Sequence, residues 1–253
     1  MDRHDLYELC TQTPERDVEL LRAMHGGRAR VLGEDFAGTA ALSRAWVKQV
    51  RGGRAIAVDR DGEPLARAEG AKGVELLLAD VRRVARKVDL LVALNFSLCE
   101  WHERRDLVAY LKHARRRLDR GGAFVADFYG GEGAFTRGRL SERHRGPRGE
   151  RIAYEFEQRE ADALTGRVVD ALHFSAKPRG GRSVRLRDAF VYDWRLWSPA
   201  ELRDALLEAG FARVEFHSRF EHARDGGGRV HVRPLVSSQE LGASFCLFVV
   251  ARR

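Results

Sequence analysis

Four polar side chains in the first part of the chain stand at the ends of short apolar segments. They are Glu34, Asp59, Asp80 and Asn95. Carboxylate and amide oxygens accept hydrogen bonds from hydroxyl and amino groups of a ligand, whereas a carboxylate repels a phosphate. Asp59 follows Glu34 by about 25 residues, a separation at which an acid can accept both hydroxyls of a ribose. One such acid alone could simply cap a helix, but the set favours a nucleoside-like ligand that carries amino groups.

The stretch 30–50 contains the first of these acids. An apolar start leads into Glu34 and Asp35, then into a turn of small residues at 36–40 (FAGTA), and then into an amphipathic segment. This order predicts strand, tight loop and helix, the opening unit of a nucleotide-type α/β sheet. Gly38 allows the backbone to approach a ligand closely. The two acids favour a ligand ammonium over a phosphate, and the G-x-G-x-x-G spacing of dinucleotide-binding proteins is absent.

Apolar segments alternate with amphipathic segments over most of the chain. Near-continuous apolar strands separated by helices are typical of a parallel sheet that is covered on both faces, so the expected fold class is α/β. The expected strands begin at 31 and then span 54–59, 74–80, 88–95, 123–128, 211–220 and 244–252. The expected helices span 14–25, 42–50, 61–70, 103–118 and 200–210.

Between residues 130 and 195 this pattern changes. The segment 130–149 is rich in glycine and arginine, and we expect it to form a loop. From 151 to 193 apolar and polar residues alternate, and turn residues at 164–166 and 178–181 divide the segment. This pattern predicts three antiparallel strands joined by hairpins.

The polar strand ends resemble those of the class I S-adenosylmethionine (SAM)-dependent methyltransferases. The first motif of that family, acid-x-Gly-x-Gly-x-Gly, falls on residues 34–40 and keeps only its middle glycine, Gly38. Asp59 matches the ribose-binding acid of the family, Asp80 and Val81 match its adenine-contact pair, and 95–98 (NFSL) matches the stretch that lines the methyl-transfer site. The resemblance implies SAM as the cofactor and the following cofactor-binding residues: Glu34, Phe36, Gly38, Ala40, Asp59, Arg60, Asp80, Val81, Asn95 and Phe96.

The end of the chain carries the resemblance further. Its helix, strand, long loop and terminal strand fit the reversed last strands of the methyltransferase sheet. The implied fold is a Rossmann-like, seven-stranded, mostly parallel sheet whose seventh strand is antiparallel. The implied domains are a SAM-binding core, 1–130 and 196–253, and an inserted antiparallel substrate lid, 131–195. The lid is loosely similar to that of small-molecule N-methyltransferases of the glycine and amino-sugar kind.

Methyl transfer is an in-line displacement at a sulfonium, so catalysis depends on positioning, and on a base where the acceptor carries a proton. The candidate catalytic residues are His102, because histidine is a residue type that often serves as a general base, Tyr129, and Tyr7, which could fold over the cofactor. His102 could equally face solvent at the start of a helix, and Tyr7 could serve only in packing. His173 and Arg187 are further candidates from the lid. No metal site is expected.

The chain has a net charge of +8 and a sequence pI of about 9.8. A basic surface can serve nucleic acid or an acidic partner, but the basic residues are interleaved with acids and fit solvated faces as well. The segment 95–98 lacks the Asn/Asp-Pro-Pro-aromatic clamp used on nucleobase amines. We therefore expect a small-molecule acceptor with an N or O nucleophile. RNA or protein methylation, or a non-catalytic SAM-binding scaffold, are the alternatives.

The sequence also suggests where the protein works. No run of 18 apolar residues occurs, and the first ten residues lack the apolar core of a secretory signal. Cys10, Cys99 and Cys246 are scattered and odd in number, which argues against a disulfide framework or a zinc site. We expect a cytoplasmic protein that needs no membrane, and a homo-oligomer is compatible with the sequence.

Overall fold

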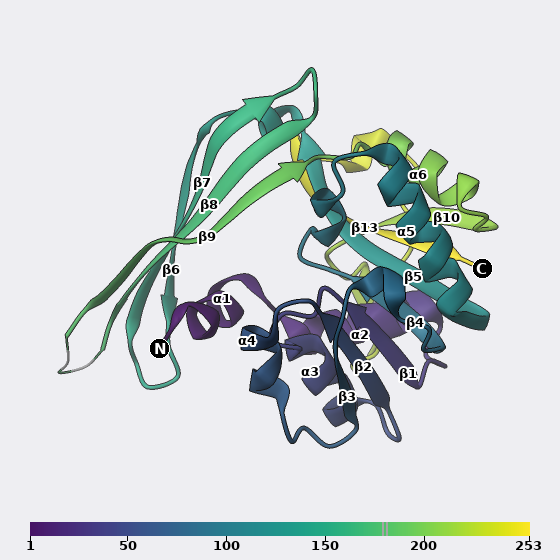
Figure 1. Ribbon diagram of the computed structural model, residues 1–253, viewed down its shortest axis with the longest axis horizontal. Helices are drawn as coiled ribbons and strands as arrows, with labels where there is room; N and C mark the ends of the chain where they lie inside the picture. Colours follow the sequence, from purple (N-terminus) through teal and green to yellow (C-terminus); the bar gives the residue numbers. More distant parts are fainter. Residues whose placement is uncertain (179, 181) are drawn as a thin grey trace. The chain divides into compact units, whose positions relative to one another are not determined.

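The chain forms two units in the computed structural model, which describes residues 1–178, 180 and 182–253 (Figure 1). The larger unit comprises Pro14–Gly131 and Trp197–Arg253, and the smaller one comprises Met1–Thr13 and Glu132–Leu196. Each unit contains its own sheet. The predicted turn at 178–181 includes residues 179 and 181, which lie outside the described residues.

The larger unit is built on a seven-stranded sheet with the order β10-β13-β5-β4-β1-β2-β3. Its strands are β1 (Val31–Asp35), β2 (Arg54–Asp59), β3 (Val74–Leu78), β4 (Val88–Ala93), β5 (Leu118–Gly131), β10 (Arg213–Ser218) and β13 (Ser244–Arg252). The first five run parallel, and β13 is antiparallel to both of its neighbours, β5 and β10. The predicted Rossmann-like sheet with an antiparallel last strand is therefore confirmed.

Helices cover both faces of this sheet, and the apolar residues of each strand divide between the two faces. The helices are α2 (Pro14–His25), α3 (Ala41–Gln49), α4 (Gly62–Leu65), α5 (Arg104–Arg117) and α6 (Pro199–Glu208). Leu90 and Val92 of β4 pack in the core that includes α2 and α3, whereas Leu91 and Ala93 pack in the core that includes α5 and α6. This period of two explains why the strands read as continuous apolar runs in the sequence.

The smaller unit is a four-stranded antiparallel sheet together with helix α1 (Arg3–Thr11). Its strands pair in chain order: β6 (Gly138–Arg145), β7 (Arg151–Asp162), β8 (Arg167–Lys177) and β9 (Val184–Arg195). The prediction of a loop over residues 130–149 is wrong for the part of this segment that forms β6. This edge strand is exposed along nearly its whole length and carries charged residues, so it lacks the apolar alternation that identifies a strand in the sequence.

Residues 1–13 belong to the smaller unit, whereas the expected domain division placed them in the SAM-binding core. Asp2 caps α1 with its side chain and forms a capping box with Asp5. Leu6 is fully buried in one apolar cluster with Ile152 and Phe174 of the antiparallel sheet. This burial joins the N-terminal helix to the smaller unit.

The segment 221–242, expected to be a loop, contains a short hairpin formed by β11 (Ala223–Arg224) and β12 (Val230–His231).

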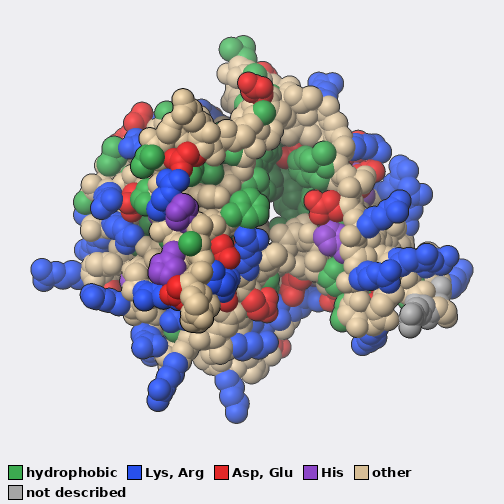
Figure 2. Space-filling view, turned by 180° about the vertical axis from the view of Figure 1, so that it is seen from behind, with side chains coloured by type: hydrophobic (Ala, Val, Ile, Leu, Met, Phe, Trp, Pro, Cys, Tyr) green, Lys and Arg blue, Asp and Glu red, His purple; other side chains and the backbone are tan. Residues whose placement is uncertain are grey.

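Among the described residues, no helix has the length and apolar character needed to cross a membrane. Figure 2 shows Lys and Arg side chains over much of the visible face, with acidic side chains among them.

Candidate functional site

The loop after β1 has an unusual backbone. Phe36, Gly38 and Ala40 adopt positive φ angles of 57°, 51° and 53°. Left-handed conformations are ordinary for glycine but cost a residue with a Cβ roughly 1–2 kcal/mol. These are the three positions at which the methyltransferase motif carries glycine. The chain therefore has a left-handed conformation at all three of these positions, although two of them are not glycine.

Packing at the two non-glycine positions offsets this cost. Ala40 is fully buried in a small apolar cluster with Ala57 and Leu65. The ring of Phe36 meets Tyr110 edge to face with a centroid distance of 5.7 Å, and it meets Trp101 at 6.2 Å. Such aromatic contacts contribute about 0.5–1.5 kcal/mol each beyond the burial of area.

Gly38 provides a test of the loop conformation. Apart from its chain neighbours, no atom of the described residues lies within 4 Å of a Cβ built at this position, so the cost of Gly38→Ala is conformational rather than steric. We expect the variant to lose about 1–2 kcal/mol of unfolding free energy in urea. Gly226→Ala is the control, because Gly226 is equally open and is not among the positive-φ glycines, and it should cost nothing. Equal effects of the two substitutions would contradict the left-handed conformation of Gly38.

Glu34 belongs to β1, and its carboxylate meets the first turn of α3. Its Oε2 accepts hydrogen bonds from the backbone N–H of Ser43 at 2.8 Å and from the Ser43 hydroxyl at 2.5 Å. The N-terminal end of a helix favours negative charge. Burial nevertheless raises the pKa of Glu34 to about 7. The carboxyl group is therefore partly protonated near neutrality and would ionise fully beside a cation. Because both bonds end on Oε2, Oε1 is the oxygen that we expect a ligand ammonium to meet.

Asp35, the next residue, points into a different environment. Its carboxylate accepts two bonds from Nη1 of Arg117, at 2.7 and 2.8 Å, and one from the Tyr110 hydroxyl at 3.0 Å. All three side chains are buried. The prediction that both acids repel a phosphate was thus wrong for Asp35, because its charge is compensated inside the protein.

Asp59 joins the end of β2 to the loop. Its Oδ2 accepts from the backbone N–H of Gly38 at 2.7 Å, and its Oδ1 accepts from the N–H of Asp61 at 2.9 Å. Each carboxylate oxygen can accept more than one hydrogen bond, so both retain capacity for a ligand hydroxyl. The structure therefore brings together Gly38 and Asp59, which the sequence separates by a helix.

Asp80 follows β3 and caps the short helix η2 (Val81–Arg83). Its carboxylate also binds the Arg82 side chain at 2.5 Å, and this hydrogen bond is the largest of the effects that lower the pKa of Asp80 to about 2. Val81 is buried. The Arg82 guanidinium in turn lies 5.3 Å from the ring centroid of Trp101, which stacks on Tyr110. Asp80 is thus an anionic acceptor whose partner Arg82 lies against Trp101, and the Trp101 ring in turn contacts Phe36.

Arg60 and Glu100 link the end of β2 to the short helix η3 (Ser97–Glu100), which follows β4. Their side chains form an exposed ion pair at 3.3 Å. Exposed pairs of this kind contribute little to stability. The pair matters mainly because it spans the edge of the sheet at which the polar strand ends gather.

Asn95 and Phe96, after β4, both have positive φ angles, 57° and 62°. The buried carboxylate of Asp127 fixes this turn by accepting the Phe96 N–H at 2.8 Å. Arg219 compensates the charge of Asp127 at 2.5 Å and also contacts Asp17 at 3.2 Å. A network from β5, α2 and the segment after β10 therefore holds the turn at the end of β4.

The three candidate catalytic residues fall in different places. The ring of Tyr129, in β5, meets that of Phe96 edge to face at 5.0 Å, so Tyr129 stands beside the turn after β4. His102 is half-buried between η3 and α5. Tyr7 belongs to the smaller unit, where its ring lies 5.0 Å from that of Phe190.

His173 lies at a β-bulge in the antiparallel sheet and forms hydrogen bonds that stabilise it. The pairing of β8 with β9 shifts between Leu172 and Phe174, and Asp188 opposite has a φ of 50°. Nδ1 of His173 accepts the Asp188 N–H at 2.9 Å, and Nε2 contacts Glu157 at 3.0 Å. Both ring nitrogens are therefore engaged in holding a β-bulge.

The sequence analysis did not identify the residues that hold the polar strand ends in place. Ser43, Arg82, Arg117 and Asp127 each contact a strand end or its turn, and Arg219 contacts Asp127. Only Asp127 gave a signal in the sequence, as an acid inside the apolar strand AFVADF. The others are arginine and serine residues in polar surroundings, which no pattern distinguishes.

Comparisons with known proteins support the fold. No family model and no curated protein matches the chain by sequence. Solved structures match it closely in shape. DesVI of Streptomyces venezuelae has a TM-score of 0.72 at 19% identity, covering 98% of this chain and 95% of its own. The sugar N-methyltransferase KedS8 of Streptoalloteichus sp. has a TM-score of 0.68 at 20% identity. The match covers 98% of this chain and 90% of KedS8.

SAM-bound CalS10, an amino pentose methyltransferase of Micromonospora echinaspora involved in calicheamicin biosynthesis, has a TM-score of 0.67 at 16% identity, covering 98% of this chain and 94% of its own. At these identities the likeness establishes the fold. It extends over nearly the whole chain, so it includes both the parallel core and the antiparallel sheet.

Proposed function

We propose that this protein is an enzyme that transfers a methyl group from SAM to a small-molecule acceptor. The observation that carries the proposal is the left-handed loop at 36–40, because Asp59 binds its middle residue and Glu34 is buried beside it. The likeness to a SAM-bound amino pentose methyltransferase and a sugar N-methyltransferase supports the same function.

The residues present fit the cofactor. Open space at Gly38 allows a ligand to approach the backbone closely. Glu34 supplies an acceptor for an ammonium, Asp59 acceptors for ribose hydroxyls, and Asp80 with the buried Val81 an edge for adenine. When bound, SAM supplies an electrophilic methyl group on a sulfonium. The protein's contribution is to hold the acceptor in line and to exclude water.

The turn at Asn95 and Phe96 is the place where we propose that the acceptor is oriented. Its backbone is fixed by the buried Asp127, and the hydroxyl of Tyr129 can donate to or accept from a nucleophile there. His102 is the proposed base for an acceptor that must lose a proton. An amine acceptor that is already neutral would need positioning alone.

Acceptor recognition is the role that we propose for the antiparallel sheet. Phe190, Tyr192 and Trp194 of β9 form a row of stacked rings with centroid distances of 6.3 and 4.3 Å. Phe190 and Tyr192 are half-buried and can offer aromatic surface to the apolar face of a sugar, whereas the buried Trp194 supports Tyr192 in the stack. Tyr7 packs against the first ring of this row, so its proposed role becomes support of acceptor recognition.

Asp59→Asn tests the cofactor assignment. We expect the affinity for SAM in calorimetry to fall by about 10–100-fold, because a charged acceptor of hydrogen bonds is lost. Asp61→Asn is the matched control. It removes the same charge two residues away, and asparagine caps α4 as well as aspartate does. Unchanged SAM affinity in Asp59→Asn, or an equal loss in Asp61→Asn, would refute the ribose assignment.

The acceptor class is tested by methyl transfer from labelled SAM. We expect incorporation into amino sugars and other small amines, and none into RNA or protein. Transfer to RNA alone would favour the alternative reading of the basic surface. SAM binding without transfer to any acceptor class would favour a scaffold.

A further inference from the structure

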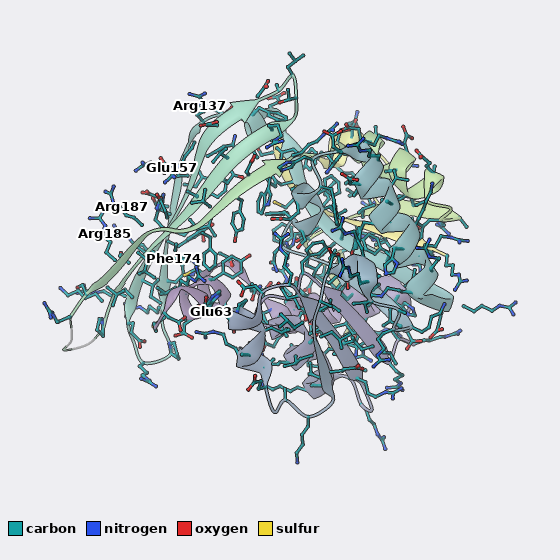
Figure 3. All side chains as sticks on the ribbon, in the orientation of Figure 1. Glu63, Arg137, Glu157, Phe174, Arg185 and Arg187 are labelled. Atoms are coloured by element: carbon teal, nitrogen blue, oxygen red, sulfur yellow. The ribbon has the colours of Figure 1, made fainter. Side chains whose placement is uncertain are left out.

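A pocket of about 360 Å³ lies on the polar face of the antiparallel sheet. Figure 3 shows Glu157, Arg185 and Arg187 on one side of this sheet and Phe174 on the other. The apolar side packs α1 through Leu6 and contains Phe174. The pocket is lined mainly by polar residues, together with Tyr154, Phe174 and Leu186, and its lining includes no residue assigned to the cofactor.

At one end of the pocket, five side chains form an ionic network in which each member contacts another member. They are Arg139, Glu157, Arg159, His173 and Asp188. Glu157 accepts from Arg139 at 2.6 Å and from Arg159 at 3.0 Å, in addition to its contact with His173. Arg159 also pairs with Asp188. These partners hold the pKa of Glu157 at about 2, chiefly through hydrogen bonds from Arg139 and Arg159.

This network argues against a metal ion. Glu157, His173 and Asp188 lie close enough together to ligate one. A divalent cation would have to displace two guanidinium groups, and His173 already uses both ring nitrogens in the bulge. Carboxylates that are saturated by arginine are poor metal ligands.

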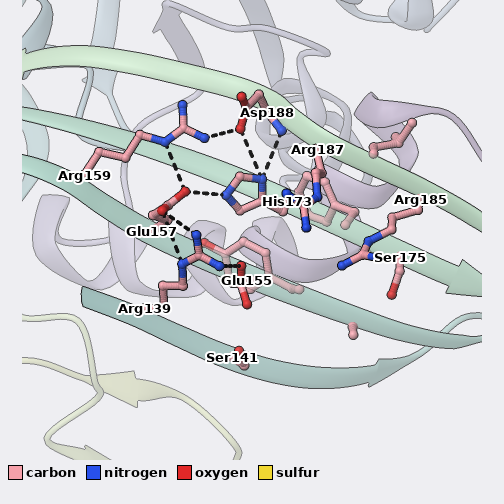
Figure 4. A pocket seen from close by; sticks show the side chains of 14 residues that line it. Arg139, Ser141, Glu155, Glu157, Arg159, His173, Ser175, Arg185, Arg187 and Asp188 are labelled. Atoms are coloured by element: carbon pink, nitrogen blue, oxygen red, sulfur yellow. Dashed lines mark hydrogen bonds and ion pairs between the residues drawn. The ribbon is translucent and has the colours of Figure 1, made fainter. Parts of the chain in front are cut away.

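The other end of the pocket carries excess positive charge. Arg185 and Arg187 of β9 line it together with Ser141 and Ser175, and Ser175 is the direct cross-strand partner of Arg185. Figure 4 shows the Arg185 guanidinium near Ser175 and the Arg187 guanidinium next to His173, on the side toward Arg185. Within the described part of the chain, neither arginine forms an ion pair or a side-chain hydrogen bond. Two like charges two residues apart on one strand repel each other unless an anion lies between them.

We propose that this pocket binds a phosphate or pyrophosphate group. Two guanidinium groups offer planar pairs of donors that match phosphate oxygens, and the serine hydroxyls add neutral donors. The Ala153 methyl, adjacent to Ser175 in the sheet, leaves room above the strand. The ionic network fixes the bulge from which Arg187 projects.

The test is calorimetric titration of the full-length protein with sodium pyrophosphate at low ionic strength. We expect saturable binding that is weakened about tenfold or more by Arg185→Ser and by Arg187→Ser, and less by Arg187→Lys. Arg105→Ser, which removes an exposed arginine of α5 in the larger unit, should change the affinity less than about twofold. Circular dichroism confirms that each variant is folded.

Several outcomes would overturn the proposal. These are absence of saturable binding up to about 10 mM, an equal effect of Arg105→Ser, or Zn²⁺ binding that Glu157→Gln abolishes. Inorganic phosphate and glucose 1-phosphate distinguish the sources of the group. Equal affinities indicate a free anion, and a stronger sugar phosphate indicates a phosphorylated metabolite. Because the readout is binding, the result is independent of methyl transfer.

Discussion

Arg117→Met is expected to lower the free energy of unfolding by about 3–5 kcal/mol, because it leaves the Asp35 carboxylate buried without its cation. The Arg117 and Asp35 side chains are 2% and 0% exposed, so solvent cannot replace the lost partner. Tyr110 retains one bond to Asp35. Burial and the Asp35 charge hold the pKa of Tyr110 well above its ordinary value, so the phenol stays a donor. Urea unfolding at pH 7 measures the loss.

Two further variants make this result specific. Asp35→Asn combined with Arg117→Met removes both charges, and it should recover about 1–3 kcal/mol relative to Arg117→Met alone. Arg86→Met breaks the exposed pair with Glu75 by the same substitution, and it should cost less than about 1 kcal/mol. A loss in Arg117→Met no larger than that in Arg86→Met would show that Asp35 is not dependent on its partner.

The second large effect is a pH dependence that Glu34 causes. The pKa of Glu34 is about 7 in the folded protein against an ordinary value of 4.5, so the folded state holds this proton more tightly than the unfolded chain. The stability that the proton provides is complete below pH 4.5 and is lost as the pH rises to about 7. By linkage the loss amounts to roughly 3 kcal/mol.

Glu34→Gln isolates this contribution. The amide oxygen can still accept from Ser43, but it does not titrate. The unfolding free energy of the variant relative to the original protein should therefore rise by roughly 3 kcal/mol between pH 4.5 and 8, and then level off. Parallel stability curves over this range would contradict the raised pKa.

The same group links pH to the proposed cofactor. A ligand ammonium beside Glu34 favours the ionised carboxylate, so SAM binding near pH 6.5 should release a proton. Calorimetry in two buffers of different ionisation enthalpy measures the release, and Glu34→Gln should abolish it. Retention of proton release in the variant would place the titrating group elsewhere.

The parallel core, and the edge at which its polar residues gather, could be inferred from patterns in the amino-acid sequence. Continuous apolar strands separated by helices require a sheet covered on both faces, and the carboxyl ends of parallel strands meet at one edge. Glu34, Asp59 and Asp80 could therefore be placed together without coordinates. These inferences depend on periods and spacings within single segments, which a sequence displays directly.

The environment of each strand end, by contrast, depends on residues that meet it in the folded protein. Glu34 and Asp35 are neighbours in the chain, yet successive side chains of a strand point to opposite faces. Glu34 therefore meets the start of α3 and Asp35 meets Arg117 of α5. The left-handed angles of Phe36 and Ala40 could not be predicted either, since both residue types disfavour them and buried packing compensates the cost. Such features depend on partners that are distant in the chain, and a single sequence gives no sign of which partners will meet.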